Sequence, residues 1–227
     1  MKAHIFLLIV LLQILRHAPS TQAVKYVAIN DAKSYPGGAR FEAEIGVPYT
    51  LKIMEQINNF IWDILQQHNE TDRKPVETVT VFIQQYDGAE AITYGEHINV
   101  SSLYLQGYQG NLKWEYTSLL YHEMTHVFQW NGEGTTPVGL VEGVADYMIL
   151  VSNYYPPGFA KPGTGDRWDQ GYDFTARFLE YCEGLRSGFV ADLNKMMRHH
   201  FSEDYFVKLM GKPLGQLWAE YKAKYKK

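Results

Sequence analysis

The sequence predicts an α+β fold, with a small mixed sheet in its first half and helices in its second half. Residues 76–84 read VETVTVFIQ, an alternating and β-branched pattern that is typical of a strand. Over residues 49–67, apolar side chains recur at three- and four-residue steps, which indicates an amphipathic helix. From Trp114 onward every predicted element is a helix. Strands that come first and helices that follow are characteristic of the α+β class.

The other elements of the first half are short. Residues 24–28 form a strand-like run, and a turn-rich stretch follows through the Pro-Gly-Gly of residues 36–38. Pro48 suits the first turn of the helix over residues 49–67, where the amide hydrogen that proline lacks is not needed. Beyond an Asp-Gly turn, the sequence predicts one or two short strands at residues 91–94 and 97–100.

The second half is predicted to be helical at residues 115–130, 139–152, 169–183, 188–198 and 213–225. No internal repeat, low-complexity tract or long linker divides the chain. We therefore expect residues 24–227 to fold as one domain, which we expect to act as a monomer.

The first 23 residues have the features of a cleaved secretory signal peptide. Lys2 gives a positive start, residues 5–12 (IFLLIVLL) are uniformly apolar, and Thr21 and Ala23 offer the small residues that signal peptidase accepts. The alternative is a membrane anchor, but the apolar run is shorter than the roughly 20 residues of a spanning helix. No later segment is long and apolar enough to span a membrane. We expect a secreted, extracellular protein with no membrane association after cleavage.

Composition excludes several classes of protein. Without residues 1–23 the chain carries 19 Lys and Arg against 25 Asp and Glu, a net charge of −6, which argues against a nucleic-acid partner. Cys182 is the sole cysteine, so the chain has no internal disulfide. It lies on the apolar side of its predicted helix, where we expect a buried structural thiol.

Secretion gives meaning to two glycosylation sequons. Asn69 begins Asn-Glu-Thr and Asn99 begins Asn-Val-Ser. Asn69 is the better candidate because the polar residues around it predict an exposed loop.

His122, Glu123 and His126 form an H-E-x-x-H pattern inside a predicted helix. Positions i and i+4 share a helix face, so both imidazoles can bind one zinc ion. Glu123 lies beside that face, where it can act as the base without being a ligand. The alternative is a chance match among the 8 histidines of the chain, so the surrounding sequence has to supply a third ligand.

Glu142 and Asp146 are a second i and i+4 pair, in the next predicted helix. Carboxylates in so apolar a stretch are unfavourable unless they meet a cation. We assign Glu142 as the third zinc ligand and Asp146 as the acceptor that orients a ligand histidine. Two alternatives stay open: a solvated pair on an exposed face, and the exchanged roles, with Asp146 on zinc and Glu142 behind it.

These motifs, at residues 122–130, 139–147, 171–184 and 216–222, resemble the plant basic secretory protein family over nearly all of the mature chain. That family comprises secreted, defence-associated zinc peptidases of plants and bacteria. The resemblance implies a single zincin-like metalloprotease domain, in plants exported to the apoplast. Residues 142–145 (EGVA) also look like the signature of glutamate zincins, whose corresponding glutamate binds zinc. The chain differs from the family's name in being acidic.

The predicted function is zinc-dependent hydrolysis of peptide or protein substrates. Tyr172 is the candidate that stabilises the oxyanion, although a purely structural role is an equal alternative among 17 tyrosines. The resemblance also implies that a strand edge within residues 91–100 aligns an extended substrate. The competing hypothesis is a secreted defence protein that binds a glycan or protein and uses zinc only for stability. We interpret three further histidines as structural: His97, and the His199-His200 pair, which we place at the end of a helix.

Overall fold

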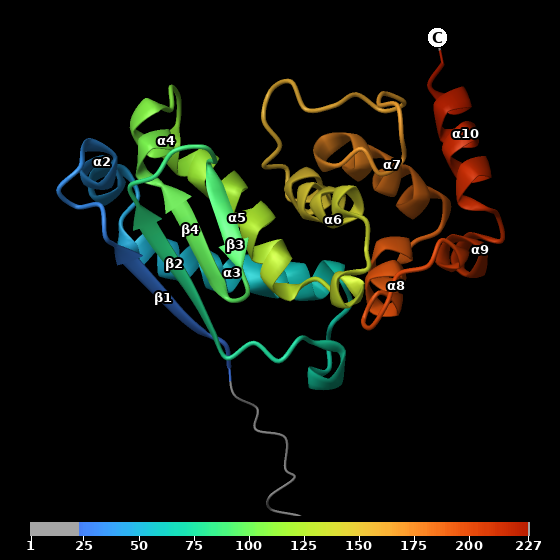
Figure 1. The fold of residues 1–227 in the computed structure, drawn as a ribbon, viewed down its shortest axis with the longest axis horizontal. Helices are drawn as coiled ribbons and strands as arrows, with labels where there is room; N and C mark the ends of the chain where they lie inside the picture. Colours follow the sequence, from blue (N-terminus) through green and yellow to red (C-terminus); the bar gives the residue numbers. More distant parts are fainter. Residues whose placement is uncertain (1–22, 227) are drawn as a thin grey trace, which may run out of the picture.

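The computed structural model describes residues 23–226, and it shows a four-stranded mixed sheet followed by a mostly helical second half. Apart from Ala23, the predicted signal peptide lies outside the described residues. In Figure 1 the sheet occupies one side of the molecule, the late helices occupy the other, and α5 runs between them. The predicted α+β class is therefore confirmed.

The sheet has the strand order β1-β2-β4-β3. Its strands are β1 (Lys25–Asn30), β2 (Thr78–Gln84), β3 (Ala91–Tyr94) and β4 (His97–Ser101). The first, second and fourth strands run parallel, whereas β3 pairs antiparallel with β4, and no other strand within residues 23–226 pairs with it. The sheet thus ends in a short strand whose outer edge is free for pairing.

Four helices accompany the sheet: α2 (Pro36–Glu44), α3 (Val47–Ile64), α4 (Ser102–Gly107) and α5 (Leu112–Phe128). Helix α3 contacts both β1 and α5, and α5 also contacts β3. The side chain of Asn111 caps α5 by accepting a hydrogen bond from the Trp114 amide. The site-bearing helix therefore begins at a defined cap and lies along the edge strand.

Residues 31–35 form turns and bends, as predicted, but the turn-rich stretch does not continue through residues 36–38, because these residues begin α2. Gly37 and Gly38 are buried, and a Cβ atom at either position would collide with the backbone of Ser102 or Ala32. The glycines thus allow close approach of two backbones rather than a turn. The sequence pattern does not distinguish these two uses of glycine.

The second half consists of α6 (Val138–Val151), α7 (Tyr172–Leu185), α8 (Phe189–Met196), α9 (Asp204–Met210) and α10 (Leu214–Lys224). The short helices α4 and α9 were not predicted. Helix α7 begins at Tyr172 rather than at residue 169, and α8 ends at Met196 rather than at residue 198. Short 3-10 turns occupy Glu70–Asp72 and Gly132–Gly134.

One continuous hydrophobic core joins the sheet to the helical half. Cys182 is fully buried within this core as a free thiol, and burial raises its pKa. Its predicted structural character is confirmed. Among residues 23–226, no helix combines the length and the apolarity needed to cross a membrane.

Candidate metal centre

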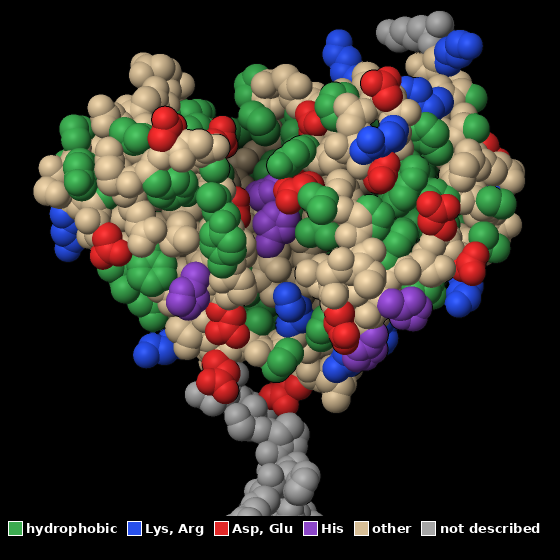
Figure 2. Space-filling model, viewed as in Figure 1, with side chains coloured by type: hydrophobic (Ala, Val, Ile, Leu, Met, Phe, Trp, Pro, Cys, Tyr) green, Lys and Arg blue, Asp and Glu red, His purple; other side chains and the backbone are tan. Residues whose placement is uncertain are grey.

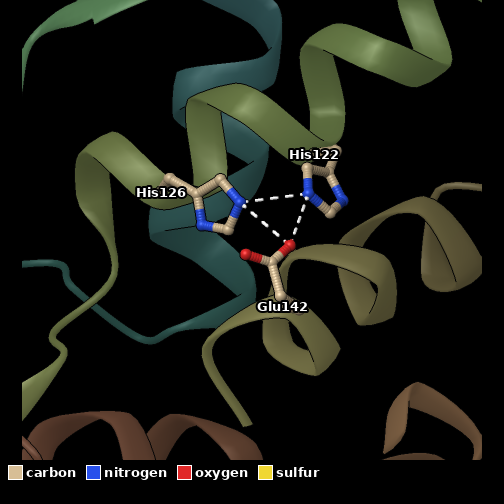
Figure 3. A group of neighbouring side chains, drawn as sticks. All are labelled: His122, His126 and Glu142. Atoms are coloured by element: carbon tan, nitrogen blue, oxygen red, sulfur yellow. Dashed lines mark hydrogen bonds and ion pairs between the residues drawn. The ribbon is translucent and has the colours of Figure 1, made fainter. Parts of the chain in front are cut away.

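Two consecutive helices bring three metal-ligating side chains together. His122 and His126 project from one face of α5, and Glu142 projects toward them from α6 (Figure 3). Within the described part of the chain, this is the group of histidine and carboxylate side chains whose donor atoms converge closely enough for one ion, all within 4.8 Å of one another. The structure thus brings together the three residues that the sequence predicts as ligands.

The distances between these donor atoms suit a small divalent cation. The Nε2 atoms of the two histidines lie 3.0 Å apart, and Oε2 of Glu142 lies 3.1 Å from His122 Nε2 and 3.5 Å from His126 Nε2. A tetrahedral ion with bonds of about 2.0–2.1 Å separates its ligands by about 3.3 Å. Two imidazole nitrogens and one carboxylate oxygen are also a donor set that zinc accepts, with one position left open.

Asp146 holds His122 from behind. Its Oδ1 lies 2.7 Å from His122 Nδ1, which leaves Nε2 directed at the shared centre. Burial opposes protonation of His122, but hydrogen bonds with Asp146 and Glu142 outweigh it and raise the pKa of His122 to about 10. For Glu142, burial alone would raise the pKa of the carboxyl group, but its contacts with His122 and His126 lower that pKa to about 2. Protons therefore compete with a metal ion for this site.

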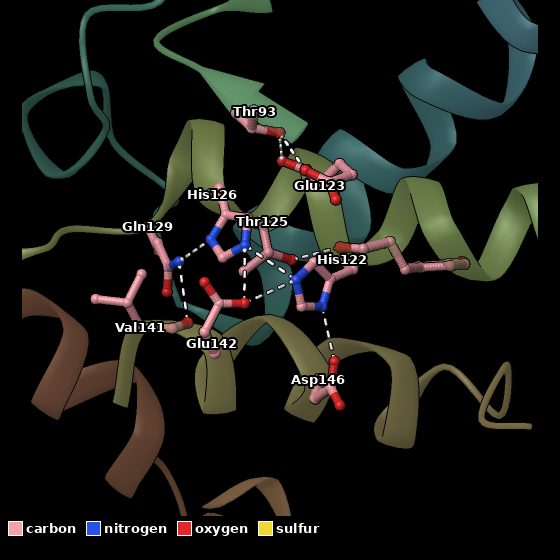
Figure 4. A network of polar contacts seen from close by, with 10 residues as sticks. Thr93, His122, Glu123, Thr125, His126, Gln129, Val141, Glu142 and Asp146 are labelled. Atoms are coloured by element: carbon pink, nitrogen blue, oxygen red, sulfur yellow. Dashed lines mark hydrogen bonds and ion pairs between the residues drawn. The ribbon is translucent and has the colours of Figure 1, made fainter. Parts of the chain in front are cut away.

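Gln129 lies against His126, a contact that sequence reasoning missed. Its Nε2 lies 2.8 Å from His126 Nδ1 and donates to the Val141 carbonyl at 3.2 Å, linking the end of α5 to α6 (Figure 4). Gln129 is buried, and its Oε1 atom has no hydrogen-bond partner among the described residues. The signal available in the sequence was its spacing, because position i+3 from His126 lies on the same helix face.

Glu123 is only 6% exposed and points away from the triad toward the edge strand. Its Oε2 accepts a hydrogen bond from the Thr93 hydroxyl at 2.5 Å, and the same hydroxyl lies 3.2 Å from the Glu123 carbonyl oxygen. Thr93 was also missed, since it is 30 positions away and no local spacing connects it to the motif.

The triad lies in a cleft of about 1060 Å³ between the sheet edge and the helical half. Figure 2 shows this hollow, with histidine and acidic side chains inside it. Ala91, Ile92 and Thr93 line one wall, whereas Glu142 and Tyr172 line the other. The free edge of β3 and the candidate metal centre thus share one cavity.

Tyr172 lies beside His122, with the two rings nearly parallel at 14° and their centroids 6.0 Å apart. The residue is 57% exposed in the cleft, and its backbone adopts a φ of 47°, which is strained for a bulky side chain. The charge of Glu142, followed by burial, raises the pKa of the Tyr172 phenol. Tyr172 is therefore a neutral hydrogen-bond donor at the cleft wall.

Close packing of α6 against α7 places Tyr172 there. Gly139 and Gly143 face the start of α7, where a Cβ atom would collide with the Asp169 carbonyl or with Thr175. The Thr175 hydroxyl accepts from the Gly171 amide and donates to the Trp168 carbonyl, both at 2.9 Å, which sets the entry into α7. The glycines next to the candidate ligand thus have a packing purpose.

The other predicted residues lie away from this centre. Asn69 is exposed beside a 3-10 turn, and Asn99 is half-buried within β4. His97 begins β4, as expected of a strand histidine. His199 contacts Glu133 at 2.9 Å and His200 contacts Tyr205 at 2.7 Å, both beyond the end of α8 rather than within it.

Comparison with known proteins gives the family. Residues 21–221 match the family model BSP, described as "Peptidase of plants and bacteria". The "Basic secretory protease" of Boswellia serrata is 45% identical over 58 residues, which cover 26% of this chain and 66% of that relative, just under two thirds. No solved structure matches the chain. The chain belongs to the BSP family of peptidases of plants and bacteria.

Proposed function

We propose that this protein is a secreted zinc-dependent peptidase that hydrolyses peptide bonds of protein substrates. The convergence of His122, His126 and Glu142 in a cleft that also holds the Glu123 carboxylate carries the proposal. Membership of a peptidase family supports the class of reaction. The predicted signal at residues 1–23 supports secretion, and the family resemblance supports a role in plant defence.

His122, His126 and Glu142 would hold the ion, with the Asp146 carboxylate accepting from Nδ1–H of His122 to orient that imidazole. When bound there, zinc supplies a Lewis acid that polarises the scissile carbonyl and makes water a stronger acid. The donor set leaves room for substrate, because three protein ligands do not close a tetrahedral site. A purely structural zinc normally has four cysteine or histidine ligands, so this arrangement favours catalysis over the alternative of a binding protein.

Glu123 is the proposed general base and acid. It takes a proton from the attacking water and later delivers it to the nitrogen of the leaving amine. Glu123 follows His122 on α5 and lines the cleft on the side of β3, so its carboxylate borders the cavity that holds the triad without being a ligand. The contact with Thr93 keeps one carboxylate oxygen directed toward β3.

Tyr172 is the proposed oxyanion donor. Its phenol keeps its proton, because neighbouring Glu142 and burial raise the pKa of the group. A neutral hydroxyl at the cleft wall can donate a hydrogen bond to the oxygen that gains charge as the carbonyl is attacked. The free edge of β3, on the opposite wall, would hold an extended substrate by strand pairing.

The test compares zinc-loaded wild-type protein with Glu123→Gln on denatured casein. We expect wild type to hydrolyse casein and the variant to lose at least about a hundredfold in rate, with zinc content unchanged. Equal residual activity in both proteins, with zinc bound to both, would contradict the catalytic proposal and favour the alternative, in which zinc only stabilises a defence protein that binds a glycan or protein.

A further inference from the structure

Thr93 contacts the proposed general base from the edge strand. Its hydroxyl donates to Glu123 Oε2 at 2.5 Å, and among the described residues no other group donates a hydrogen bond to this carboxylate (Figure 4). Glu123 is almost fully buried, so water does not replace this contact freely. The orientation of the carboxylate therefore depends on a single side chain.

The register of β3 indicates where the backbone of Thr93 points. Glu90 and Ser101 form a hydrogen-bonded pair, since the Ser101 amide donates to the Glu90 carbonyl at 2.9 Å. Hydrogen-bonded and non-hydrogen-bonded pairs alternate along an antiparallel ladder. Thr93, which pairs with Ile98, therefore falls in a non-hydrogen-bonded pair. Its N–H and C=O groups point away from β4, toward the free edge of the sheet in the cleft.

From these two observations we infer that Thr93 is a positioning residue that couples substrate alignment to the general base. Its backbone presents to an extended peptide a donor and an acceptor that no described residue pairs with, and its hydroxyl fixes the carboxylate that moves the proton. A substrate strand that pairs with β3 is thereby placed in register with Glu123. This inference rests on the proposed peptidase function.

The two roles separate when only the hydroxyl is removed. Thr93→Val keeps the shape, the strand preference and the backbone of the residue, so substrate pairing persists. The buried carboxylate loses its donor, and a hydrogen bond to a charged group of this kind accounts for about a ten- to hundredfold difference in rate. We expect that fall in kcat, with KM within about twofold of wild type.

The experiment measures kcat, KM and zinc content for wild type, Thr93→Val, Thr93→Ser and Glu123→Gln. The serine variant retains the hydroxyl and should recover most of the lost rate. The double variant Thr93→Val/Glu123→Gln should be no slower than Glu123→Gln alone, because the hydroxyl acts through the carboxylate. Thr93→Ala serves as the second hydroxyl-free variant if the valine variant does not fold.

The outcomes distinguish this inference from the proposed function. A wild-type protein without peptidase activity overturns both. If wild type is active and Glu123→Gln is not, an unchanged kcat in Thr93→Val overturns the role of Thr93 alone. A loss that serine fails to restore, or one that appears in KM rather than in kcat, also overturns it.

Discussion

Glu142 and Asp146 lie one helical turn apart on α6 and contact different atoms of the same histidine. Glu142 approaches the Nε2 atoms of both histidines, whereas Asp146 contacts only His122 Nδ1. This difference in contacts favours Glu142 as the ligand over the exchanged assignment. Both carboxylates contact histidine side chains, so they do not form a solvated pair on an exposed face. Each carboxylate therefore has a separate proposed role: Glu142 binds the ion, and Asp146 orients His122.

Substitution of the two carboxylates should separate these tasks. We expect Glu142→Ala to abolish zinc binding, because it removes one of three ligands, and Asp146→Asn to weaken affinity by about 10–100-fold. Native mass spectrometry and chelator competition measure both effects. The reverse order, with zinc lost in Asp146→Asn and retained in Glu142→Ala, would support the exchanged assignment.

Removal of the Tyr172 hydroxyl should affect the transition state alone. Tyr172→Phe keeps the ring beside His122, so we expect zinc content and KM to stay close to wild type while kcat falls by about a hundredfold. Steady-state hydrolysis of a peptide measures this split. An unchanged kcat would assign Tyr172 a structural role.

The stability of the metal-free protein should depend on pH through His122 and Glu142. The pKa of His122 is raised from 6.5 to about 10, so its contribution is complete below pH 6.5 and is lost as pH rises toward 10. The pKa of Glu142 is lowered from 4.5 to about 2, so its contribution is complete above pH 4.5 and is lost as pH falls toward 2.

We therefore expect these two groups to stabilise the chelator-treated protein most between pH 4.5 and 6.5, which urea unfolding at several pH values measures. The matched variant Glu142→Gln should lose less stability between pH 6.5 and 10, because it lacks the carboxylate that favours the imidazolium. Identical alkaline profiles for the two proteins would contradict this linkage.

At the scale of elements, the contact of α6 with α7 has little tolerance for added volume. Gly143→Ala would place a methyl group against the buried Thr175 side chain, and we expect a loss of about 1–3 kcal/mol in the free energy of unfolding. Gly184 is exposed on α7 with open space around it, so Gly184→Ala is the matched control and should gain about 0.5–1 kcal/mol. Urea unfolding compares the two, and equal stability would contradict the packing argument.

The elements that could be predicted from sequence are those with a strong local period. The helix at α3, the strand at β2 and the i, i+4 pairs on α5 and α6 all follow from spacing within one segment. Helix α2 could not be recognised, because its two glycines allow close approach to other backbone segments, Gly37 to the distant Ser102 and Gly38 to Ala32, and the sequence pattern does not show either contact. Thr93 was missed because its contact with Glu123 arises from sheet topology, whereas Gln129 offered only its i+3 spacing from His126, a spacing that many residues share.

In the folded molecule, the exposure of the two sequon asparagines should decide which of them carries a glycan. Asn69 is exposed in the connection between α3 and β2, whereas Asn99 lies in an internal strand, and Ser101 of its own sequon is buried. For protein secreted from a eukaryotic host, we expect Asn69→Gln to lower the mass by one glycan. Asn99→Gln should change little, as intact mass spectrometry before and after glycosidase treatment will measure. A full glycan at Asn99 would show that modification precedes folding of this strand.

The position of the three candidate ligands on consecutive helices has a consequence for the order of folding. His122 and Glu142 are only 20 positions apart, so closing the chain between them requires little loss of entropy. The hairpin of α5 and α6 can therefore capture an ion before residues from α7 onward are in place. Tyr172 takes its place later, because it begins α7 and the start of α7 packs against α6. A nascent chain with the proposed function would thus acquire its ion first and its complete cleft last, so that a partly synthesised chain would hold metal before it could hydrolyse neighbouring chains.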